Sequence, residues 1–190
     1  MIKIPTLFKR EFIKEGRRTV DIITHNEVTE GCEWVLEGEG VAYIKLDGTC
    51  CLIQDGKLYK RFDYKKGRKL PEGAIPCQEK ADEITGHFPH WVKCDDKPDD
   101  KWHMKAFKDT RGLSDGTYEL IGEHFNGNKQ MVGGDLFIKH DSDVILIKNP
   151  PRTFNEIKRY LENSQMEGIV FHRGNGDMCK IKRSDFGFEW

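Results

Sequence analysis

The sequence has no long hydrophobic run and no excess of charge of either sign. No part of its 190 residues approaches the roughly 18 consecutive apolar residues of a membrane-spanning helix. The stretch Met1–Gly16 has charges inside any apolar core, which argues against a signal peptide. Lys and Arg number 31 and Asp and Glu number 32, so the net charge of −1 does not predict a nucleic-acid partner. We therefore expect a soluble, intracellular (cytoplasmic) protein in which any nucleic acid is held by a local patch.

Cysteine pairs with CxxC spacing are also missing, although the chain has 6 cysteines. Without an export signal, these cysteines are better explained as reduced thiols than as a disulfide framework. Cys77, His87, His90 and Cys94 carry zinc-type donors, but no pair of them has the short spacing of a strong zinc site. We expect the two histidines to belong to a polar loop rather than to a metal centre.

Short extended segments separated by turn residues recur along the chain, a pattern typical of antiparallel sheets. Asp55-Gly56 and Gly174-Asn175-Gly176-Asp177 each separate two such segments, which predicts two hairpins. We expect a third pair of strands to flank His140–Asp143. The expected strands are Val41–Ile44, Cys50–Gln54, Lys57–Asp63, Thr117–Glu123, Asp135–Lys139, Val144–Lys148, Glu167–His172 and Met178–Lys182.

One helix is predicted near the C-terminus. Thr153 and Glu156 have the spacing of a capping box, and an apolar stripe follows, so we expect a helix to about Glu162. The first 30 residues show no clear period, and residues 71–110 are expected to form an irregular insertion. The length fits one domain, and the strands with few helices predict an α+β fold.

The motif Lys45-Leu46-Asp47-Gly48 is the first one with chemical meaning. A lysine at the end of a strand, before a tight glycine turn, can be aimed into a cleft. Its amine is a nucleophile only when deprotonated, and nearby cations or a metal favour that state. Alone, the four residues also fit a surface lysine, because such a match occurs by chance in roughly a few per cent of proteins.

Two further segments place charged side chains on expected strands. Strand alternation puts Lys180 and Lys182 on one face and Ile181 on the other. Two neighbouring ammonium groups require an anion between them, such as a phosphate or a carboxylate. Glu167 offers a carboxylate for a divalent metal, and Glu119 offers one to a ribose. Solvated strands with mixed charges are the alternative for both segments.

Taken in order, these segments resemble the motifs shared by the covalent nucleotidyltransferases, which include DNA ligases, RNA ligases and mRNA capping enzymes. The closer resemblance is to small ATP-dependent RNA ligases. The chain departs from their pattern where Lys129, rather than proline, follows the Asn-Gly-Asn segment. The resemblance rests on Lys45–Gly48, the strand with Arg61, Asp100–His103, Tyr118–Gly122, Asn126–Asn128, Glu167–Val170 and Lys180–Gly187.

The resemblance implies an α+β nucleotidyltransferase (adenylation) domain of mostly antiparallel sheets with flanking helices. This single domain would span residues 1–190, with no C-terminal accessory domain. Lys45 would attack the α-phosphate of ATP and form a lysyl-AMP intermediate. AMP would then pass to an RNA 5′-phosphate, and a 3′-hydroxyl would displace it and seal the strand. ATP and Mg²⁺ or Mn²⁺ are the implied cofactors, and RNA with 5′-phosphate and 3′-hydroxyl ends is the implied partner.

The resemblance also assigns roles to individual residues. Lys45 is the implied catalytic residue, Lys180 and Lys182 would hold the α-phosphate, and Glu167 would lie next to the metal. Two others, an arginine and a glutamate, would contact the nucleotide sugar. The implied nucleotide-binding residues are Asp47, Arg61, Glu119, Phe137, Glu167, Lys180 and Lys182.

Some alternatives stay open at this stage. Phe137 is the candidate to stack on adenine because of its strand position, but a place in the core is the common fate of such a residue. A DNA ligase and a capping-type guanylyltransferase carry similar motifs. A module that binds nucleotide or RNA without catalysis is the alternative from another class.

Overall fold

In this computed structural model, residues 3–16, 18–65, 67, 69–83 and 86–190 are described. They fold into two compact units. Unit 1 comprises Met1–Lys3 and Asp47–Val144, and unit 2 comprises Ile4–Leu46 and Ile145–Trp190. The chain thus passes into unit 1 after Leu46 and returns to unit 2 after Val144. The sequence predicted a single domain over residues 1–190. That statement stays a prediction.

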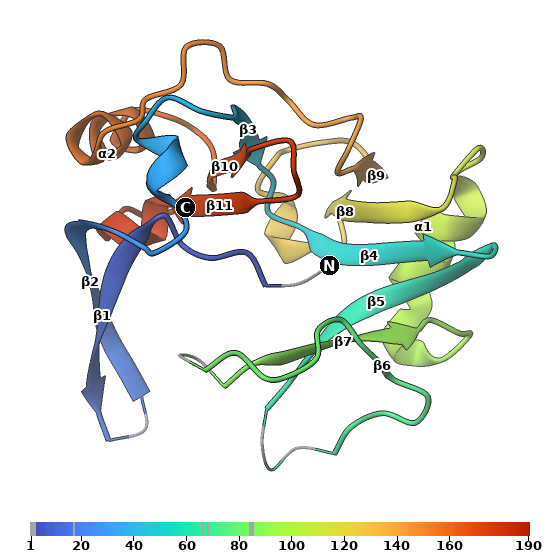
Figure 1. The fold of residues 1–190 in the computed structure, drawn as a ribbon. Helices are drawn as coiled ribbons and strands as arrows, with labels where there is room; N and C mark the ends of the chain where they lie inside the picture. Colours follow the sequence, from blue (N-terminus) through green and yellow to red (C-terminus); the bar gives the residue numbers. More distant parts are fainter. Residues whose placement is uncertain (1–2, 17, 66, 68, 84–85) are drawn as a thin grey trace. The chain divides into compact units, whose positions relative to one another are not determined.

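A six-stranded sheet forms the framework of unit 1 (Figure 1). Its strands all pair antiparallel with their neighbours, in the order β6-β7-β5-β4-β8-β9. The predicted hairpin between β4 and β5 is confirmed, and both turn residues, Asp55 and Gly56, have the positive φ of a type I′ turn. The strands are β4 (Thr49–Gln54), β5 (Lys57–Tyr64), β6 (Ile75–Pro76), β7 (Phe88–Lys93), β8 (Gly116–Gly122) and β9 (Asp135–Lys139).

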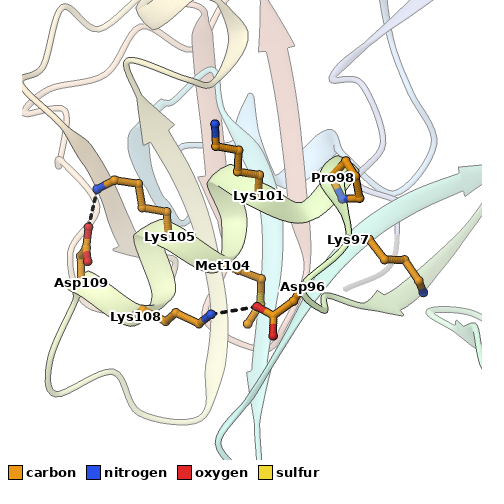
Figure 2. Close-up of a pocket in the computed structure, with 8 residues that line it drawn as sticks. All are labelled: Asp96, Lys97, Pro98, Lys101, Met104, Lys105, Lys108 and Asp109. Carbon is orange, nitrogen blue, oxygen red and sulfur yellow. Dashed lines mark hydrogen bonds and ion pairs between the residues drawn. The ribbon is translucent and has the colours of Figure 1, made fainter.

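One face of this sheet is covered by α1 (Lys101–Asp109) and carries the core of unit 1. Cys51, Leu120 and Phe137 are among the buried side chains on that face. Because successive strand residues alternate, their neighbours along each strand point to the opposite face. The outer side of α1 carries a row of lysines (Figure 2). Two 3₁₀ turns, η2 (Pro98–Asp100) and η3 (Asn126–Asn128), complete the unit.

Unit 2 is built on a three-stranded antiparallel sheet in the order β11-β10-β3. Its strands are β3 (Val41–Lys45), β10 (Gly168–His172) and β11 (Met178–Lys182). The predicted second hairpin, between β10 and β11, is confirmed. Unit 2 also contains β1 (Phe8–Glu15), β2 (Arg18–Val28), α2 (Phe154–Glu162) and the 3₁₀ turns η1 (Glu33–Val35) and η4 (Arg183–Phe186).

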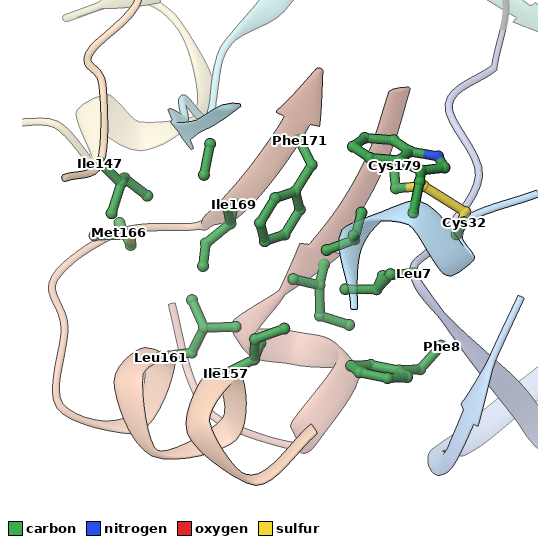
Figure 3. Packing of buried hydrophobic residues seen from close by; sticks show 14 residues of the cluster. Leu7, Phe8, Cys32, Ile147, Ile157, Leu161, Met166, Ile169, Phe171 and Cys179 are labelled. Atoms are coloured by element: carbon green, nitrogen blue, oxygen red, sulfur yellow. A yellow bond between two sulfur atoms is a disulfide. The ribbon is translucent and has the colours of Figure 1, made fainter. Parts of the chain in front are cut away.

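The helix α2 packs its apolar stripe into the core of unit 2 (Figure 3). It begins with the predicted capping box, in which Thr153 accepts from the Glu156 N–H and the Glu156 carboxylate accepts from the Thr153 N–H. Ile157 and Leu161 are fully buried beside Ile169 of β10. The predicted helix and the α+β class are therefore confirmed.

The expected strand Val144–Lys148 is wrong, because β9 pairs with β8 instead. The backbone of residues 145–147 makes isolated bonds to β3, from Ile44 N–H to Ile145 and from Ile147 N–H to Ala42. The prolines at 150 and 151 lack an N–H and cannot extend such a ladder. The segment therefore follows an edge of the unit 2 sheet without becoming one of its strands.

Strands and a helix also form in two regions whose sequence shows no periodic pattern of apolar residues. The hairpin of β1 and β2 has register shifts between Phe8 and Arg10 and between Ile13 and Lys14. Such bulges interrupt the alternation from which a strand is predicted. Within the stretch 71–110 that was expected to be irregular, β7 pairs with β5, and α1 forms two turns. A helix this short, with Ala106 as its one buried residue, presents too few apolar positions for a periodic signal.

Two cysteines correct the expectation that all six thiols are reduced. Cys32 and Cys179 form a disulfide, with Cα atoms 6.2 Å apart and a sequence separation of 147 residues. The bond joins the start of η1 to β11 inside unit 2. Cys50, Cys51, Cys77 and Cys94 are free thiols. In the part of the chain that the structure describes, no helix has the length and apolarity needed to cross a bilayer.

Candidate functional site

Two motif lysines of unit 2 lie in one row across its sheet. Lys45 at the end of β3 is in register with Gly168 of β10, which is in register with Lys182 of β11. Residues in register on neighbouring strands point to the same face. The two lysines therefore share a face, and Gly168, which has no side chain, separates them.

Glu167, the residue before β10, joins the two lysines. Its Oε2 lies 2.5 Å from the Nζ of Lys45, and its Oε1 lies 2.5 Å from the Nζ of Lys182. The Glu167 side chain is 7% exposed, against 18% for Lys45 and 33% for Lys182. A carboxylate this buried needs its charge compensated, and both oxygens are compensated here. Glu167 is thus the anion that two neighbouring ammonium groups require.

Gly168 is needed at the centre of this row for steric reasons. A Cβ at this position would lie 2.2 Å from the carbonyl oxygen of Ile181 and 2.9 Å from the Cα of Lys182. Both are backbone atoms of β11, which cannot move away without breaking the strand pair. The Glu-Gly sequence of the motif therefore lets β11 approach closely enough for Lys182 to reach Glu167.

Lys180 lies one further row along the same face. It is in register with Val170 of β10, which is in register with Tyr43 of β3. Ile181, between the two lysines of β11, is fully buried in the core of unit 2. The prediction that Lys180 and Lys182 share a face opposite Ile181 is confirmed. Unit 2 thus presents Lys45, Lys180 and Lys182 together.

In unit 1, an asparagine holds the residues that follow the motif lysine. The Nδ2 of Asn126 donates to the Asp47 carboxylate at 2.8 Å and to the carbonyl oxygen of Gly48 at 2.7 Å. Asn126 has a φ of 45°, a left-handed conformation that asparagine tolerates well. The Asn-Gly-Asn segment of the sequence resemblance therefore has a structural task, which is to fix Asp47 and Gly48.

Gly48 is also held by the strand β8. Its N–H donates to the Oε1 of Glu119 at 3.1 Å. A Cβ on Gly48 would lie 2.4 Å from the carbonyl oxygen of Leu120 and 2.7 Å from a methyl group of Ile121. Only glycine fits between the motif turn and β8. Glu119 is thereby oriented by the backbone of the motif itself.

Glu119 lies on the sheet face of unit 1 that points away from α1, together with other polar groups. It is in register with Cys50 of β4. Its Oε2 lies 3.3 Å from the Nε2 of His140, the residue that follows β9. Arg61 of β5 points to the same face, because its neighbour Lys60 is in register with Cys51 of the opposite face. The structure thus places on one sheet face the two residues that the resemblance assigns to the sugar.

The surroundings of Cys50 change the pKa of its thiol. Burial, and then the nearby Glu119 carboxylate, raise the pKa of Cys50 to about 12. Arg61 acts in the opposite direction but does not compensate for these effects. The thiol is therefore protonated at neutral pH, and a free Cys50 is a weak nucleophile.

Phe137 lies on the other face of the same sheet. It is in register with Leu120, is 9% exposed, and packs edge-to-face on Tyr118 with ring centroids 5.8 Å apart. It belongs to the core of unit 1, the alternative that the sequence left open. Its neighbour Ile138 is in register with Glu119 and points to the polar face instead.

Sequence reasoning missed two residues around Glu119, and it gave Asn126 no role of its own although this residue belongs to the resemblance. Cys50 and His140 flank Glu119, and Asn126 holds the motif turn. No local pattern marks Cys50 or His140, since each reaches Glu119 only through strand pairing. Among the described residues, Cys77, His87, His90 and Cys94 are not part of a group of three donors close enough to share a metal ion.

A groove of about 610 Å³ follows the outer side of α1. It is lined by lysines and two aspartates (Figure 2). Lys105 pairs with Asp109 at 2.5 Å, and Lys108 pairs with Asp96 at 2.8 Å. Lys97, which also lines the groove, pairs with Asp95 at 2.6 Å. Because carboxylates compensate these ammonium groups, the groove offers little net positive charge to a phosphate chain.

Comparisons with known proteins agree with the motifs. A family model described as RNA ligase 1 matches residues 106–190. The chain is 26% identical to RNA ligase 1 of Danio rerio, over 99% of this chain and 81% of the relative. It is 24% identical to RNA ligase 1 of Rattus norvegicus and of Mus musculus, in each case over 79% of this chain and 68% of the relative. The resemblance to RNA ligases is confirmed.

Proposed function

We propose that this chain is an ATP-dependent RNA ligase with Lys45 as its nucleophile. The observation that carries the proposal is the row of Lys45, Gly168 and Lys182 joined by Glu167. A lone surface lysine before a turn would not have a buried carboxylate and a second lysine on the same face. The relatives named RNA ligase 1 support RNA as the substrate.

In the proposed first step, the Nζ of Lys45 attacks the α-phosphorus of ATP. The N–P bond of lysyl-AMP forms, the bond to pyrophosphate breaks, and the amine loses its proton to solvent. Lys182 and Lys180 supply positive charge for the α-phosphate, on the face where Lys45 ends its strand. Such transfer depends mainly on positioning and charge neutralisation, which a row of lysines fixed on a sheet provides.

In the second and third steps, an RNA 5′-phosphate attacks lysyl-AMP and takes over AMP, which restores the Lys45 amine. A 3′-hydroxyl then attacks the activated phosphate, loses its proton, and AMP leaves. By the same resemblance, Glu119 and Arg61 contact the nucleotide sugar. Asp47 belongs to the motif, and its hydrogen bond from Asn126 gives it a positioning role.

Glu167 fits the proposed Mg²⁺ or Mn²⁺, because these cations prefer carboxylate oxygens. When bound, such a cation would neutralise phosphate charge. In the ion-paired state described here, Glu167 holds Lys45, and an ammonium in an ion pair is not a nucleophile. Release of Lys45 from Glu167 is therefore part of the proposal. The sheet itself need not change, since the contact involves side chains alone.

Covalent self-labelling tests the nucleophile. The protein is stripped of any bound AMP with pyrophosphate, incubated with α-labelled ATP and Mg²⁺ or Mn²⁺, and denatured. We expect label on the wild type, at least about 1,000-fold less on Lys45→Arg, and full label on the matched control Lys158→Arg, which changes an exposed lysine of α2. Absence of label on folded wild type with either metal contradicts the proposal.

The acceptor is tested with the labelled protein. We expect AMP to pass to a 5′-phosphorylated RNA strand, and the strand to be joined to a 3′-hydroxyl end. Transfer to DNA alone would make the chain a DNA ligase, and labelling by GTP alone would point to capping chemistry. A label that discharges to neither strand would contradict the RNA ligase.

A further inference from the structure

Three side chains of unit 1 bring a soft, a borderline and a hard metal donor together. They are Cys50 of β4, Glu119 of β8 and His140 after β9. The Sγ of Cys50, a carboxylate oxygen of Glu119 and a ring nitrogen of His140 all lie within 4.8 Å of one another. Cys50 and Glu119 lie on paired strands, and His140 directly follows β9 with its N–H bonded to the carbonyl oxygen of Thr117 on β8, so strand pairing sets the spacing of the three donors.

Two of these donors are oriented by further hydrogen bonds. The Oε1 of Glu119 accepts from the Gly48 N–H at 3.1 Å, which leaves Oε2 directed to His140. The Nδ1 of His140 lies 3.1 Å from the hydroxyl of Thr117, which leaves Nε2 directed to Glu119. Metal-binding histidines usually have such a partner on their second nitrogen, because it fixes the ring. The arrangement therefore has the features of a prepared site.

The donor set selects the type of metal. Mg²⁺ prefers oxygen ligands, whereas a thiolate, an imidazole and a carboxylate together favour Zn²⁺. Tetrahedral Zn²⁺ with ordinary bond lengths places its ligand atoms roughly 3.5 Å apart. The donors are 3.3 Å apart for Glu119 and His140 and at most 4.8 Å apart otherwise, so small side-chain rotations are sufficient.

We propose that Cys50, Glu119 and His140 bind one Zn²⁺ ion, with the fourth position open to water. The thiol of Cys50 gives up its proton to solvent when the sulfur–metal bond forms. At present the thiol lies beside a carboxylate, which disfavours the thiolate. A bound dication would instead favour the thiolate form of Cys50, because its positive charge stabilises the thiolate and compensates the negative charge of Glu119.

The site has a consequence that rests on the proposed function. In the proposed ligase, Glu119 contacts the nucleotide sugar. Glu119 therefore cannot bind the nucleotide and the zinc ion at the same time. Zn²⁺ is then an inhibitor that competes with nucleotide binding, in contrast to the Mg²⁺ or Mn²⁺ that the reaction needs. The binding of zinc itself does not depend on this second part.

Direct metal binding tests the site without any nucleotide. Zn²⁺ affinity is measured by calorimetry, and Co²⁺ is used as a probe whose thiolate bond gives a charge-transfer band. No reductant is present, so that Cys32 and Cys179 stay joined and add no thiols. We expect the band in the wild type, its loss in Cys50→Ser, and Zn²⁺ affinity lower by at least about tenfold in Cys50→Ser and His140→Ala.

The matched control is Cys77→Ser, which removes another partly buried free thiol. It should retain the Co²⁺ band and the Zn²⁺ affinity. Circular dichroism spectra show that each variant is folded. Equal Zn²⁺ affinity in wild type and Cys50→Ser, or a wild type without the Co²⁺ band, overturns the proposal.

Competition with AMP separates the metal site from the proposed function. Zn²⁺ binding that weakens as AMP is added supports both. Zn²⁺ binding that AMP does not affect keeps the metal site and contradicts the nucleotide role of Glu119. AMP binding that Glu119→Gln weakens, in a protein that does not bind Zn²⁺, keeps the nucleotide role and overturns the metal site.

Discussion

In unit 2 the polar sheet face carries three lysines, two of which pair with one buried carboxylate, whereas in unit 1 it carries Glu119 beside a thiol and an imidazole. The charges of unit 2 are compensated within the motif, since Glu167 pairs with both Lys45 and Lys182. Unit 1 instead has donors of several chemical types around one carboxylate. The first face is thus a cationic surface stabilised by its own anion, and the second is a set of potential ligands.

The difference shows what each motif carboxylate does within the protein itself. Glu167 stabilises lysines that would otherwise repel each other, so it has a structural role in addition to its proposed role next to a metal. Glu119 accepts a hydrogen bond from the turn that follows the motif lysine and so links strand and turn. Substitutions that remove each role separately therefore test the comparison.

The largest effect is expected for Glu167→Gln. It keeps the shape of the side chain but leaves two ammonium groups without their anion. We expect self-labelling to fall at least about 100-fold. Unfolding in urea should show a loss of about 2–3 kcal/mol, somewhat less than for fully buried pairs because both lysines are partly exposed. Glu162→Gln, an exposed residue at the end of α2, is the control, and equal behaviour of the two variants would contradict the role of Glu167.

Gly168→Ala tests the same row by sterics rather than charge. The new methyl group would meet the backbone of Ile181 at 2.2 Å, so the pairing of β10 with β11 must loosen. We expect a loss of about 2 kcal/mol in unfolding free energy. Gly133→Ala should be nearly neutral, because a Cβ there meets nothing within 4 Å. A neutral Gly168→Ala would show that close approach of the strands is not required.

Asn126→Gly tests how unit 1 holds the motif turn. The substitution tolerates the positive φ but removes both hydrogen bonds to Asp47 and Gly48. We expect a loss of about 1 kcal/mol in stability and a several-fold lower rate of self-labelling. Asn149→Gly is the matched control, since Asn149 is exposed and has a φ of 49°. If both variants label at the wild-type rate, the turn needs no asparagine.

The smallest effect concerns the pH dependence of stability through Cys50. Its pKa is about 12 in the folded protein, and it is about 8.5 in the unfolded chain. Above the lower value the unfolded state loses the proton first, so stability present at pH 7 is lost as the pH rises toward 12. Between pH 7 and pH 9, urea unfolding of the wild type should lose about 0.8 kcal/mol more than that of Cys50→Ser. An equal loss would contradict the raised pKa.

Structural features that depend on a local sequence pattern could be predicted from the sequence. The Asp55-Gly56 turn, the capping box of Thr153 and the alternation around Ile181 are all confirmed. Each depends on residues a few positions apart. The resemblance to RNA ligases also led to Lys45, Glu167 and Lys182, which the structure places in contact.

Features that depend on long-range pairing could not be predicted. Glu119 meets Cys50 only because β4 and β8 pair in one particular register, although these residues lie 69 positions apart in the sequence. A shift by one residue would have put Cys51 beside Glu119 instead. The Cys32–Cys179 disulfide likewise joins residues 147 positions apart, and no spacing rule marks that pair.

The Cys32–Cys179 disulfide closes a covalent ring that includes all of Asp47–Val144. If a protease cut one peptide bond in that segment, the two fragments would stay joined through sulfur. The nicked chain would run as one band on a gel without reductant and as two bands with it. Lys45 would then be on one fragment and Glu167 on the other, still held in one molecule.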